Sequence, residues 1–213
     1  MNPEELAERI REVAVMPILI PHSADACLAI AEALVEGGAR GIEIVLRTPE
    51  ALPTVERLRR TFPELVVGAG TILTPALYDS AAAAGAHFGI SPGSLPALLE
   101  HARGGALPLV PGVQTPSEVM AAQAAGFNLL KFYPAEPAGG TDVLGDYGNV
   151  FPTARFMPSG KIDLPALPRY AALFNIASVG GTWMYAEGGA TLAAREIVAR
   201  MRVSLQVMRD GRR

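Results

Sequence analysis

Two patterns of hydrophobic and polar residues alternate along the chain. Short runs rich in β-branched and aliphatic residues recur at roughly even spacing, and alanine- and leucine-rich stretches with helical character separate them. The short runs predict eight strands, near residues 15–20, 41–47, 66–72, 87–91, 107–110, 129–133, 154–157 and 176–179. Strands that alternate with helices pair in parallel, so eight such units predict an α/β fold of the (β/α)8 TIM barrel type.

The predicted helices have recognisable starts. Thr48, Thr74 and Thr115 each precede a proline, which places a hydroxyl N-cap before a proline at the first helical position. Glu118 follows Thr115 by three residues and completes the pattern of a capping box. Each of these pairs therefore predicts the start of a helix that follows a strand.

Three further segments complete the expected organisation. Residues 4–13 predict an extra N-terminal helix, and residues 191–208 predict a closing helix. Residues 136–150 are rich in Gly, Pro and Asp, and we expect a loose segment with only a short helix there. Neither a linker nor a low-complexity segment interrupts the pattern, so we expect residues 1–213 to form a single barrel domain.

Composition excludes several classes of function. The net charge of −3 gives no electrostatic reason to bind nucleic acid or an anionic membrane surface, and no apolar run reaches the roughly 18 residues that span a bilayer. Cys27 is the single cysteine and the start of the chain lacks the pattern of a signal peptide, which favours a cytoplasmic protein. The chain has no HxH, HExxH or CxxC pair, which counts weakly against a zinc site.

One lysine lies within an apolar strand. Lys131 stands near the C-terminal end of the predicted strand at residues 129–133. An unpaired ammonium inside a protein loses its hydration, and the neutral amine, which can attack a carbonyl, becomes easier to form. Lys131 is therefore a candidate for Schiff-base catalysis. The alternative is an ordinary strand-end lysine that extends its ammonium to water, and for Lys131 alone the two interpretations are equally favoured.

The alternation of strand side chains strengthens the catalytic interpretation. Glu43 and Arg47 share one face of their strand, and the opposite face is entirely aliphatic and must pack on the outer helices. The same parity directs Lys131 and Tyr133 inward from the sixth strand. The alternative is a buried charge network, but such networks seldom persist for stability alone. In a barrel, charge at the C-terminal strand ends marks the active site.

The turns after the strands offer further candidate groups. Loops after strands seven and eight of a barrel often hold a phosphate with backbone N–H groups. Each turn is also explained by ordinary turn chemistry, and the spacing of Thr71 alone favours plain β-propensity. The residues at these turns are Thr71, Pro92, Ser159, Gly160, Lys161, Gly180, Gly181 and Thr182.

In order along the chain, these motifs resemble those of the 2-keto-3-deoxy-6-phosphogluconate (KDPG) / 4-hydroxy-2-oxoglutarate (KHG) aldolase family. The resemblance covers nearly the whole chain, and its most specific parts are the strand-six motif and the spacing of Glu43 and Arg47. The segments that carry it are residues 41–48 (GIEIVLRT), 68–71 (GAGT), 90–93 (ISPG), 111–113 (PGV), 131–136 (KFYPAE), 158–160 (PSG) and 180–183 (GGTW).

The resemblance implies a class I aldolase, a pyruvate-dependent lyase of carbohydrate metabolism that needs no metal or other cofactor. It implies that Lys131 forms a Schiff base with pyruvate, that Glu43 carries protons through a water, and that Arg47 binds the pyruvate carboxylate. It also implies a homotrimer. The other residues that it places around pyruvate are Thr71, Pro92, Tyr133 and Ser159.

The chain departs from the family pattern after strand seven. The family commonly reads Pro-Thr-Gly-Gly there, and this chain has Lys161 in place of the second glycine. Lys161 could grip a phosphate as a point charge or favour a substrate that ends in a carboxylate, so glyceraldehyde 3-phosphate and glyoxylate both remain open as the aldehyde product. The phosphate subsite in question comprises Gly160, Lys161, Gly180, Gly181 and Thr182.

Two other functions are compatible with the same fold. A phosphosugar epimerase or isomerase would need paired carboxylates or histidine ligands at the strand ends, where only Glu43 is clearly placed. A non-catalytic barrel that binds a small anion would not need Lys131, Glu43 and Arg47 together.

Overall fold

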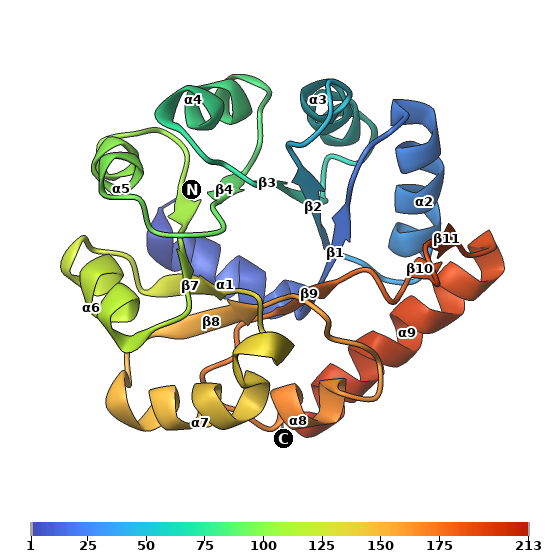
Figure 1. The fold of residues 1–213 in the computed structure, drawn as a ribbon. Coiled ribbons are helices and arrows are strands. Elements are labelled where there is room, and N and C mark those ends of the chain that lie inside the picture. The colour runs from blue at the N-terminus through green and yellow to red at the C-terminus, as the bar shows by residue number, and fades with distance from the viewer. Residues whose placement is uncertain (1, 213) are drawn as a thin grey trace.

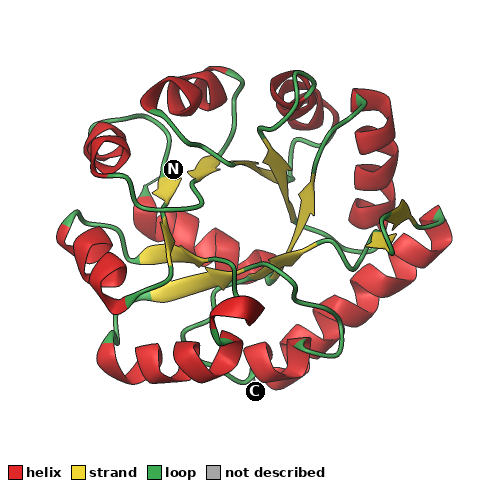
Figure 2. Ribbon diagram, viewed as in Figure 1, coloured by secondary structure: helices red, strands yellow, loops and turns green. Residues whose placement is uncertain are grey.

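The computed structural model describes residues 2–212, in which parallel strands curl around a common interior and helices cover their outer face (Figures 1 and 2). Six strands form one sheet in the order β5-β4-β3-β2-β1-β9 and three form a second in the order β6-β7-β8. The parallel strands are β1 (Val15–Leu19), β2 (Gly41–Val45), β3 (Val66–Gly70), β4 (Phe88–Ile90), β5 (Leu109–Val110), β6 (Gly112–Val113), β7 (Leu129–Phe132), β8 (Arg155–Pro158) and β9 (Val179–Gly181).

Helices follow most of the strands and form the outer layer. None of those in residues 2–212 combines the length and the apolar character that crossing a membrane requires. They are α1 (Pro3–Val13), α2 (Ala24–Glu36), α3 (Ala51–Thr61), α4 (Pro75–Ala83), α5 (Pro96–Arg103), α6 (Pro116–Ala124), the 3-10 turn η1 (Glu136–Ala138), α7 (Gly140–Val150), α8 (Leu167–Ala171) and α9 (Ala194–Gly211).

The two sheets are linked at both of their edges. Only Pro111 separates β5 from β6. Proline has no backbone N–H to donate to a neighbouring strand, but the carbonyl of Pro111 accepts a hydrogen bond from Lys131 N at 2.9 Å. At the other edge, parallel bridges join Phe156 to Ile176 and Ser159 to Gly180. The predicted fifth strand is therefore two short strands around a proline, and the eighth is shifted to Val179–Gly181.

Helix α1 covers the N-terminal ends of the strands. Its buried residues Leu6, Ile10 and Val13 pack with side chains that point into the interior of the sheet, including Met16 and Phe88. Burying each such aliphatic side chain contributes roughly 1.5–3 kcal/mol. The extra N-terminal helix predicted from the sequence therefore closes one end of the interior and leaves the C-terminal ends of the strands for a site.

The two faces of the strands divide as the alternation of residues predicts. Ile42 and Ile44 of β2 and Leu130 and Phe132 of β7 belong to the core between the sheet and the outer helices. Leu129, on the opposite face of β7, belongs to the inner core with α1. Side chains at odd positions of β7 therefore point inward, in line with the predicted parity.

One of the three predicted helix caps is wrong. Thr74 and Thr115 accept hydrogen bonds from the first turns of α4 and α6 as expected. Thr48 instead donates its hydroxyl to the carbonyl of Pro21, and α3 begins only at Ala51. The hydroxyl of Thr48 thus fastens the β2–α3 loop to the β1–α2 loop.

The segment at residues 136–150 is more ordered than predicted. It contains η1 and the full helix α7. Leu144, Tyr147 and Phe151 are buried in the outer core. Burial of these apolar side chains outweighs the low helix propensity of the Gly and Asp residues around them. Composition alone therefore underestimated this helix.

The predicted closing helix also begins later than expected. Residues Ala190–Thr191 (β11) pair antiparallel with Ala186–Glu187 (β10), and α9 starts at Ala194. The Gly-Gly turn at positions 188 and 189, where both residues have positive φ, permits this small hairpin.

Candidate active site

Lys131 and Glu43 meet inside the curled sheet. Lys131 lies on β7 and Glu43 on β2, and Lys131 Nζ is 3.2 Å from Glu43 Oε1. The two side chains are only 10% and 3% exposed. A buried charge without a partner is strongly unfavourable, so each of these groups depends on the other. The structure thus brings together the lysine and the carboxylate that the parity of two separate strands directed inward.

Glycine at position 70 makes room for the carboxylate. A Cβ atom at Gly70 would lie 2.0 Å from Glu43 Oε1. Gly68, on the same strand, makes similar room for the ring of Phe88, since a Cβ there would lie 2.5 Å from it. The small residues of the run at 68–71 therefore admit side chains of neighbouring strands close to the backbone of β3.

A small cavity lies beside the ion pair. It offers about 10 Å³ to the centre of a water-sized sphere, which is about the room that one water needs. Ser159 Oγ faces it, is buried, and has no hydrogen-bond partner among the described residues. An unpartnered buried hydroxyl is unfavourable unless a ligand or water meets it. The lining residues are Met16, Glu43, Ile90, Lys131, Met157, Ser159 and Gly180.

Arg47 and Thr71 are joined where β2 and β3 end. Arg47 Nε donates to Thr71 Oγ1 at 3.3 Å, and Arg47 is exposed. Thr71 has a φ of 62°, which is the left-handed region and is rare for a β-branched residue. That conformation costs about 1–2 kcal/mol. Plain β-propensity therefore does not explain Thr71, and strain of this kind is typical of functional sites.

Tyr133 covers the lysine from the solvent side. Lys131 Nζ lies 5.4 Å from the centroid of the Tyr133 ring, and Tyr133 is 37% exposed. An ammonium at this distance is attracted to the ring face. The aromatic ring therefore forms part of the wall between the ion pair and water.

Pro92 lies one strand away from Lys131. Its backbone packs against Gly112, where a Cβ would lie 2.2 Å from the Pro92 carbonyl carbon. Gly112 is in turn the β6 partner of Lys131. Pro92 makes no hydrogen bond to Lys131 in the described residues and does not line the small cavity, so the structure places it beside the site.

The turns after β8 and β9 run side by side. The bridge between Ser159 and Gly180 sets residues 160–161 alongside residues 181–182. Lys161 has a φ of 60° and is exposed. The backbone N–H groups of Gly160, Lys161 and Thr182 donate to no acceptor in the described residues. Three free N–H groups therefore lie in the two turns beside Ser159, next to the exposed Lys161, in an arrangement suited to an anion.

Comparison with known proteins settles the family. The model of the KDPG and KHG aldolase family matches residues 6–197. The chain belongs to the KDPG and KHG aldolase family. It is 40% identical to the 2-dehydro-3-deoxy-phosphogluconate aldolase of Pseudomonas aeruginosa, over 86% of this chain and 85% of that one. It is 38% identical to the KHG/KDPG aldolase of Escherichia coli K12, over 80% of each chain.

Solved aldolase structures share the fold. The KDPG aldolase of Legionella pneumophila, with pyruvate captured as a covalent carbinolamine intermediate, aligns with a TM-score of 0.83 at 35% identity, over 98% of this chain and 97% of that one. The KDPG aldolase of Zymomonas mobilis with 3-phosphoglycerate aligns with a TM-score of 0.89 at 35% identity, over 95% and 96% of the two chains. One of these relatives thus binds pyruvate covalently and another binds a phosphorylated acid.

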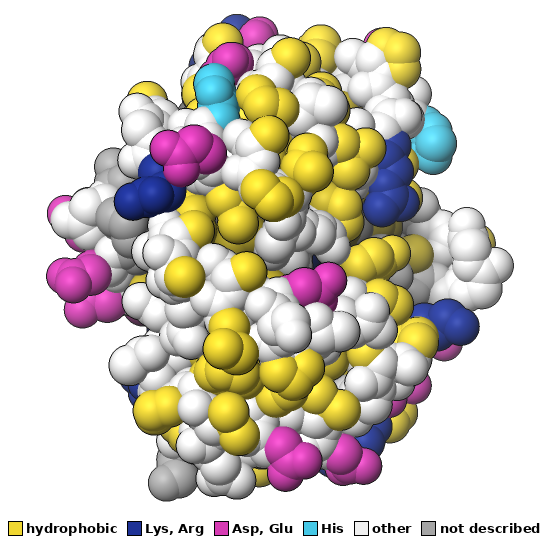
Figure 3. All heavy atoms as spheres, turned by 60° about the vertical axis from the view of Figure 1, so that its left-hand side comes forward, with side chains coloured by type: hydrophobic (Ala, Val, Ile, Leu, Met, Phe, Trp, Pro, Cys, Tyr) yellow, Lys and Arg dark blue, Asp and Glu magenta, His cyan; other side chains and the backbone are white. Residues whose placement is uncertain are grey.

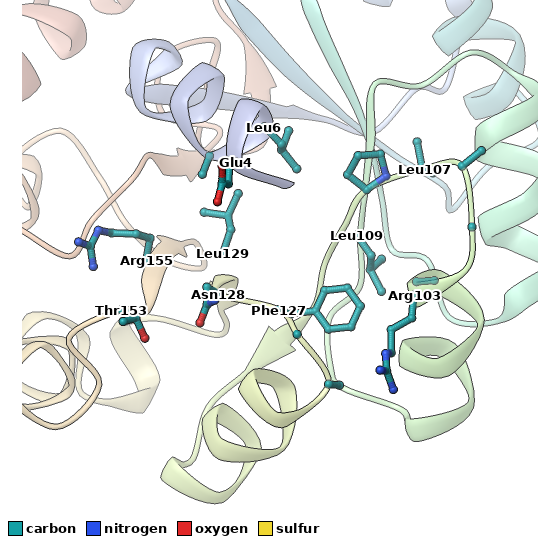
Figure 4. A pocket seen from close by; sticks show the side chains of 17 residues that line it. Glu4, Leu6, Arg103, Leu107, Leu109, Phe127, Asn128, Leu129, Thr153 and Arg155 are labelled. Carbon is teal, nitrogen blue, oxygen red and sulfur yellow. The ribbon is translucent and has the colours of Figure 1, made fainter. Parts of the chain in front are cut away.

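A larger cavity of this aldolase lies away from the ion pair. It measures about 490 Å³ and lies near α1 and the loops before β5 and β7, with Leu109, Phe127 and Leu129 around it (Figure 4). No lysine, histidine or cysteine lines it. Arg155 donates to the carbonyls of Pro152 and Ala154 at 2.9 and 2.8 Å and is already engaged. The cavity therefore lacks an amine, imidazole or thiol nucleophile and does not compete with the site around Lys131.

Sequence reasoning missed parts of the aldolase site. Met16, Ile90 and Met157 line the cavity beside Lys131 but were not among the candidates. Met157 lies in a predicted strand, and the parity argument applied to Glu43 and Lys131 would have found it. Within residues 2–212, no three His, Cys, Asp or Glu side chains gather closely enough to hold a metal ion.

Proposed function

We propose that this protein is a class I aldolase in which Lys131 forms the Schiff base. Its reaction is the reversible cleavage of KDPG to pyruvate and glyceraldehyde 3-phosphate, of KHG to pyruvate and glyoxylate, or of both. The observation that carries the proposal is the buried pair of Lys131 Nζ and Glu43 Oε1 at 3.2 Å. The similarity to the aldolase of Pseudomonas aeruginosa and the covalent pyruvate carbinolamine in the Legionella protein support it.

Schiff-base formation begins with loss of a proton from the Lys131 ammonium. The carboxylate of Glu43 is close enough to accept this proton directly. The neutral amine attacks the C2 carbonyl of the 2-keto acid and forms a carbinolamine. Glu43 returns the proton to the carbinolamine hydroxyl, which leaves as water and gives a protonated imine.

Cleavage uses the protonated imine as an electron sink. Glu43 takes the proton of the C4 hydroxyl, the C3–C4 bond breaks, and the electron pair moves through the enamine toward the imine nitrogen. The aldehyde leaves, Glu43 delivers the proton to C3, and hydrolysis releases pyruvate and the free lysine. One carboxylate can serve every transfer because each step restores it for the next.

Arg47 and Thr71 are the proposed holders of the substrate carboxylate. Arg47 donates to Thr71 through Nε alone among described residues, which leaves the fork of terminal N–H groups for a carboxylate. Tyr133 and Ser159 then enclose the carbon skeleton, with Pro92 beside them. The strained backbone of Thr71 holds its hydroxyl toward the ligand.

The turns after β8 and β9 are the proposed site for the anionic far end of the substrate. Gly160, Lys161 and Thr182 supply N–H groups, and Gly180 and Gly181 complete the backbone of the paired turns. The ammonium of Lys161 suits a phosphate or a carboxylate. Measuring kcat/KM for KDPG and KHG side by side, with and without Lys161→Gly, decides which substrate the lysine favours.

We further propose that the chain is a single-domain (β/α)8 barrel and forms a homotrimer in the cytoplasm. Closure of the barrel is supported by the parallel bridges of Phe156 with Ile176 and of Ser159 with Gly180, and by the continuity of β5 with β6.

Association of subunits is supported by the exposed hydrophobic residues Leu95 and Met120. Figure 3 shows hydrophobic side chains gathered on the face that lies at the left of Figure 1. The family resemblance suggests three subunits, and Cys27, alone and buried, suits a reducing compartment.

Three measurements test these proposals. Lys131→Ala should abolish pyruvate release from both substrates, whereas a chelator should leave the activity intact, because the proposed chemistry needs no metal. Light scattering of the purified protein should give the mass of three chains. Turnover by Lys131→Ala would refute the Schiff-base assignment, and a monomeric mass would refute the trimer.

A further inference from the structure

A groove rich in arginine lies on the side of the molecule away from Lys131. It measures about 790 Å³ and is formed by the C-terminal ends of α1 and α2 and by the last turns of α9. These helix ends adjoin the N-terminal ends of β1 and β2, so the groove is separate from the proposed aldolase site. Five arginines line it, namely Arg11, Arg40, Arg202, Arg209 and Arg212.

Two of the five arginines have structural roles. Arg202 donates to the carbonyl of Glu36 at 3.4 Å, at the end of α2. Arg212 donates to the carbonyls of Arg11 and Ala177 at 2.8 and 2.6 Å. Basic side chains commonly cap helix ends in this way, so these two arginines need no ligand.

The other three arginines have no such role. The guanidinium groups of Arg11, Arg40 and Arg209 make no hydrogen bond and no ion pair in residues 2–212, and all three are exposed. Among the residues that line the groove, Glu12 is the one carboxylate. The side chains that line the groove therefore carry five positive charges and one negative charge, although the whole chain carries a net charge of −3.

The crowding of like charges is itself unfavourable. Burial and the neighbouring charge of Arg11 both lower the pKa of Arg212. A bound anion would relieve this repulsion, since guanidinium groups form paired hydrogen bonds with phosphate oxygens. The three free guanidinium groups come from three separate elements that converge on this groove, and three positive charges together favour a ligand that carries several negative charges.

We propose that this groove binds a small molecule with two or more linked phosphate groups. The acidic remainder of the chain would repel a long nucleic acid, which favours a compact polyanion. A ligand held by Arg11, Arg40 and Arg209 joins the ends of α1, α9 and the segment before β2, and so stabilises the folded protein. This inference is independent of the proposed aldolase activity.

Calorimetric titration with sodium tripolyphosphate at low salt tests the proposal. The unmodified protein should bind one equivalent, and the double variant Arg40→Ala/Arg209→Ala should weaken binding at least tenfold. Arg195→Ala removes an exposed arginine of α9 outside the groove and should change the affinity less than twofold. The replaced side chains make no hydrogen bond or ion pair in residues 2–212, so the double variant should fold, and its unfolding midpoint without ligand should not fall below that of the unmodified protein.

Four outcomes would overturn the proposal. Absence of binding to the unmodified protein excludes the site, and unchanged binding by the double variant places the anion elsewhere. Loss of binding in Lys161→Ala would assign the anion to the turns after β8 and β9. Titrations with ATP and with a short single-stranded RNA complete the test. Binding of tripolyphosphate or ATP that depends on Arg40 and Arg209 supports a small ligand with linked phosphate groups. Tighter binding of the RNA contradicts it.

Discussion

Replacing Gly70 with alanine isolates the position of the Glu43 carboxylate from its chemistry. The new Cβ would lie 2.0 Å from Glu43 Oε1, and real Cβ contacts are essentially never shorter than 3.0 Å. The carboxylate must therefore withdraw by about 1 Å or swing away from Lys131. Cδ and Cγ of Glu43 would also lie only 2.8 and 2.9 Å from the new Cβ, so the whole Glu43 side chain must shift.

The expected effect is large on catalysis and small on stability. A misplacement of about 1 Å can reduce the rate roughly 100-fold, which corresponds to about 2.7 kcal/mol of transition-state stabilisation. Gly→Ala also lowers the entropy of the unfolded chain, which contributes about 0.4–1 kcal/mol to stability and offsets part of the strain on the Lys131–Glu43 pair. Gly70→Ala should therefore fold normally and lose most of its kcat/KM.

The assay couples pyruvate release to a dehydrogenase and reports kcat/KM for KDPG and KHG. Gly104→Ala is the matched control, because a Cβ there meets nothing within 4 Å. The control should stay within threefold of the unmodified protein, and urea unfolding of both variants checks the fold. Wild-type activity in Gly70→Ala, together with an inactive Glu43→Gln, would show that the position of the carboxylate does not limit the reaction.

Three further predictions follow from single side chains. Burial lowers the pKa of His87 from 6.5 to about 4, so only the unfolded chain takes up a proton on this histidine as the pH falls through 6.5. The free energy of unfolding, measured in urea, should therefore fall by at most about 2 kcal/mol from pH 7 to pH 5. His87→Gln should abolish this loss, and His101→Gln should leave it unchanged. The Tyr78 hydroxyl pairs with both the N–H and the carbonyl of Leu107, so Tyr78→Phe leaves both groups without a partner. The free energy of unfolding should fall by about 2–4 kcal/mol, and a change under about 0.5 kcal/mol would show that these two hydrogen bonds do not stabilise the fold. Arg47→Lys keeps the charge but loses the fork of donors, so KM for the keto acid should rise about tenfold with a smaller change in kcat; an unchanged KM would remove Arg47 from the binding role.

The encounter of Lys131 and Glu43 was accessible from the sequence because it depends only on parity. Alternation decides the face of a strand residue even when the predicted ends are off by a residue or two. The spacing of short apolar runs likewise predicted the parallel α/β organisation and the covering helix α1. A periodic pattern indicates which side of a strand each side chain faces, and this was enough to predict that Lys131 and Glu43 point into the same interior.

Other features depend on contacts between distant segments and could not be predicted. The left-handed backbone of Thr71 contradicts the local preference of threonine, and the burial of Leu144 and Tyr147 overrides the composition of α7. The arginine groove exists only because the ends of α1, α2 and α9 converge. Each of these features is decided by packing between segments that no local pattern connects.

The most direct test of the account is reductive trapping of the enzyme with pyruvate and borohydride, followed by peptide mass mapping. The chain has only two lysines, Lys131 and Lys161, so the assignment is unambiguous. We expect a reduced pyruvate adduct on the peptide that contains Lys131, and none on the peptide that contains Lys161. An adduct confined to Lys161, or no adduct at all, would contradict it.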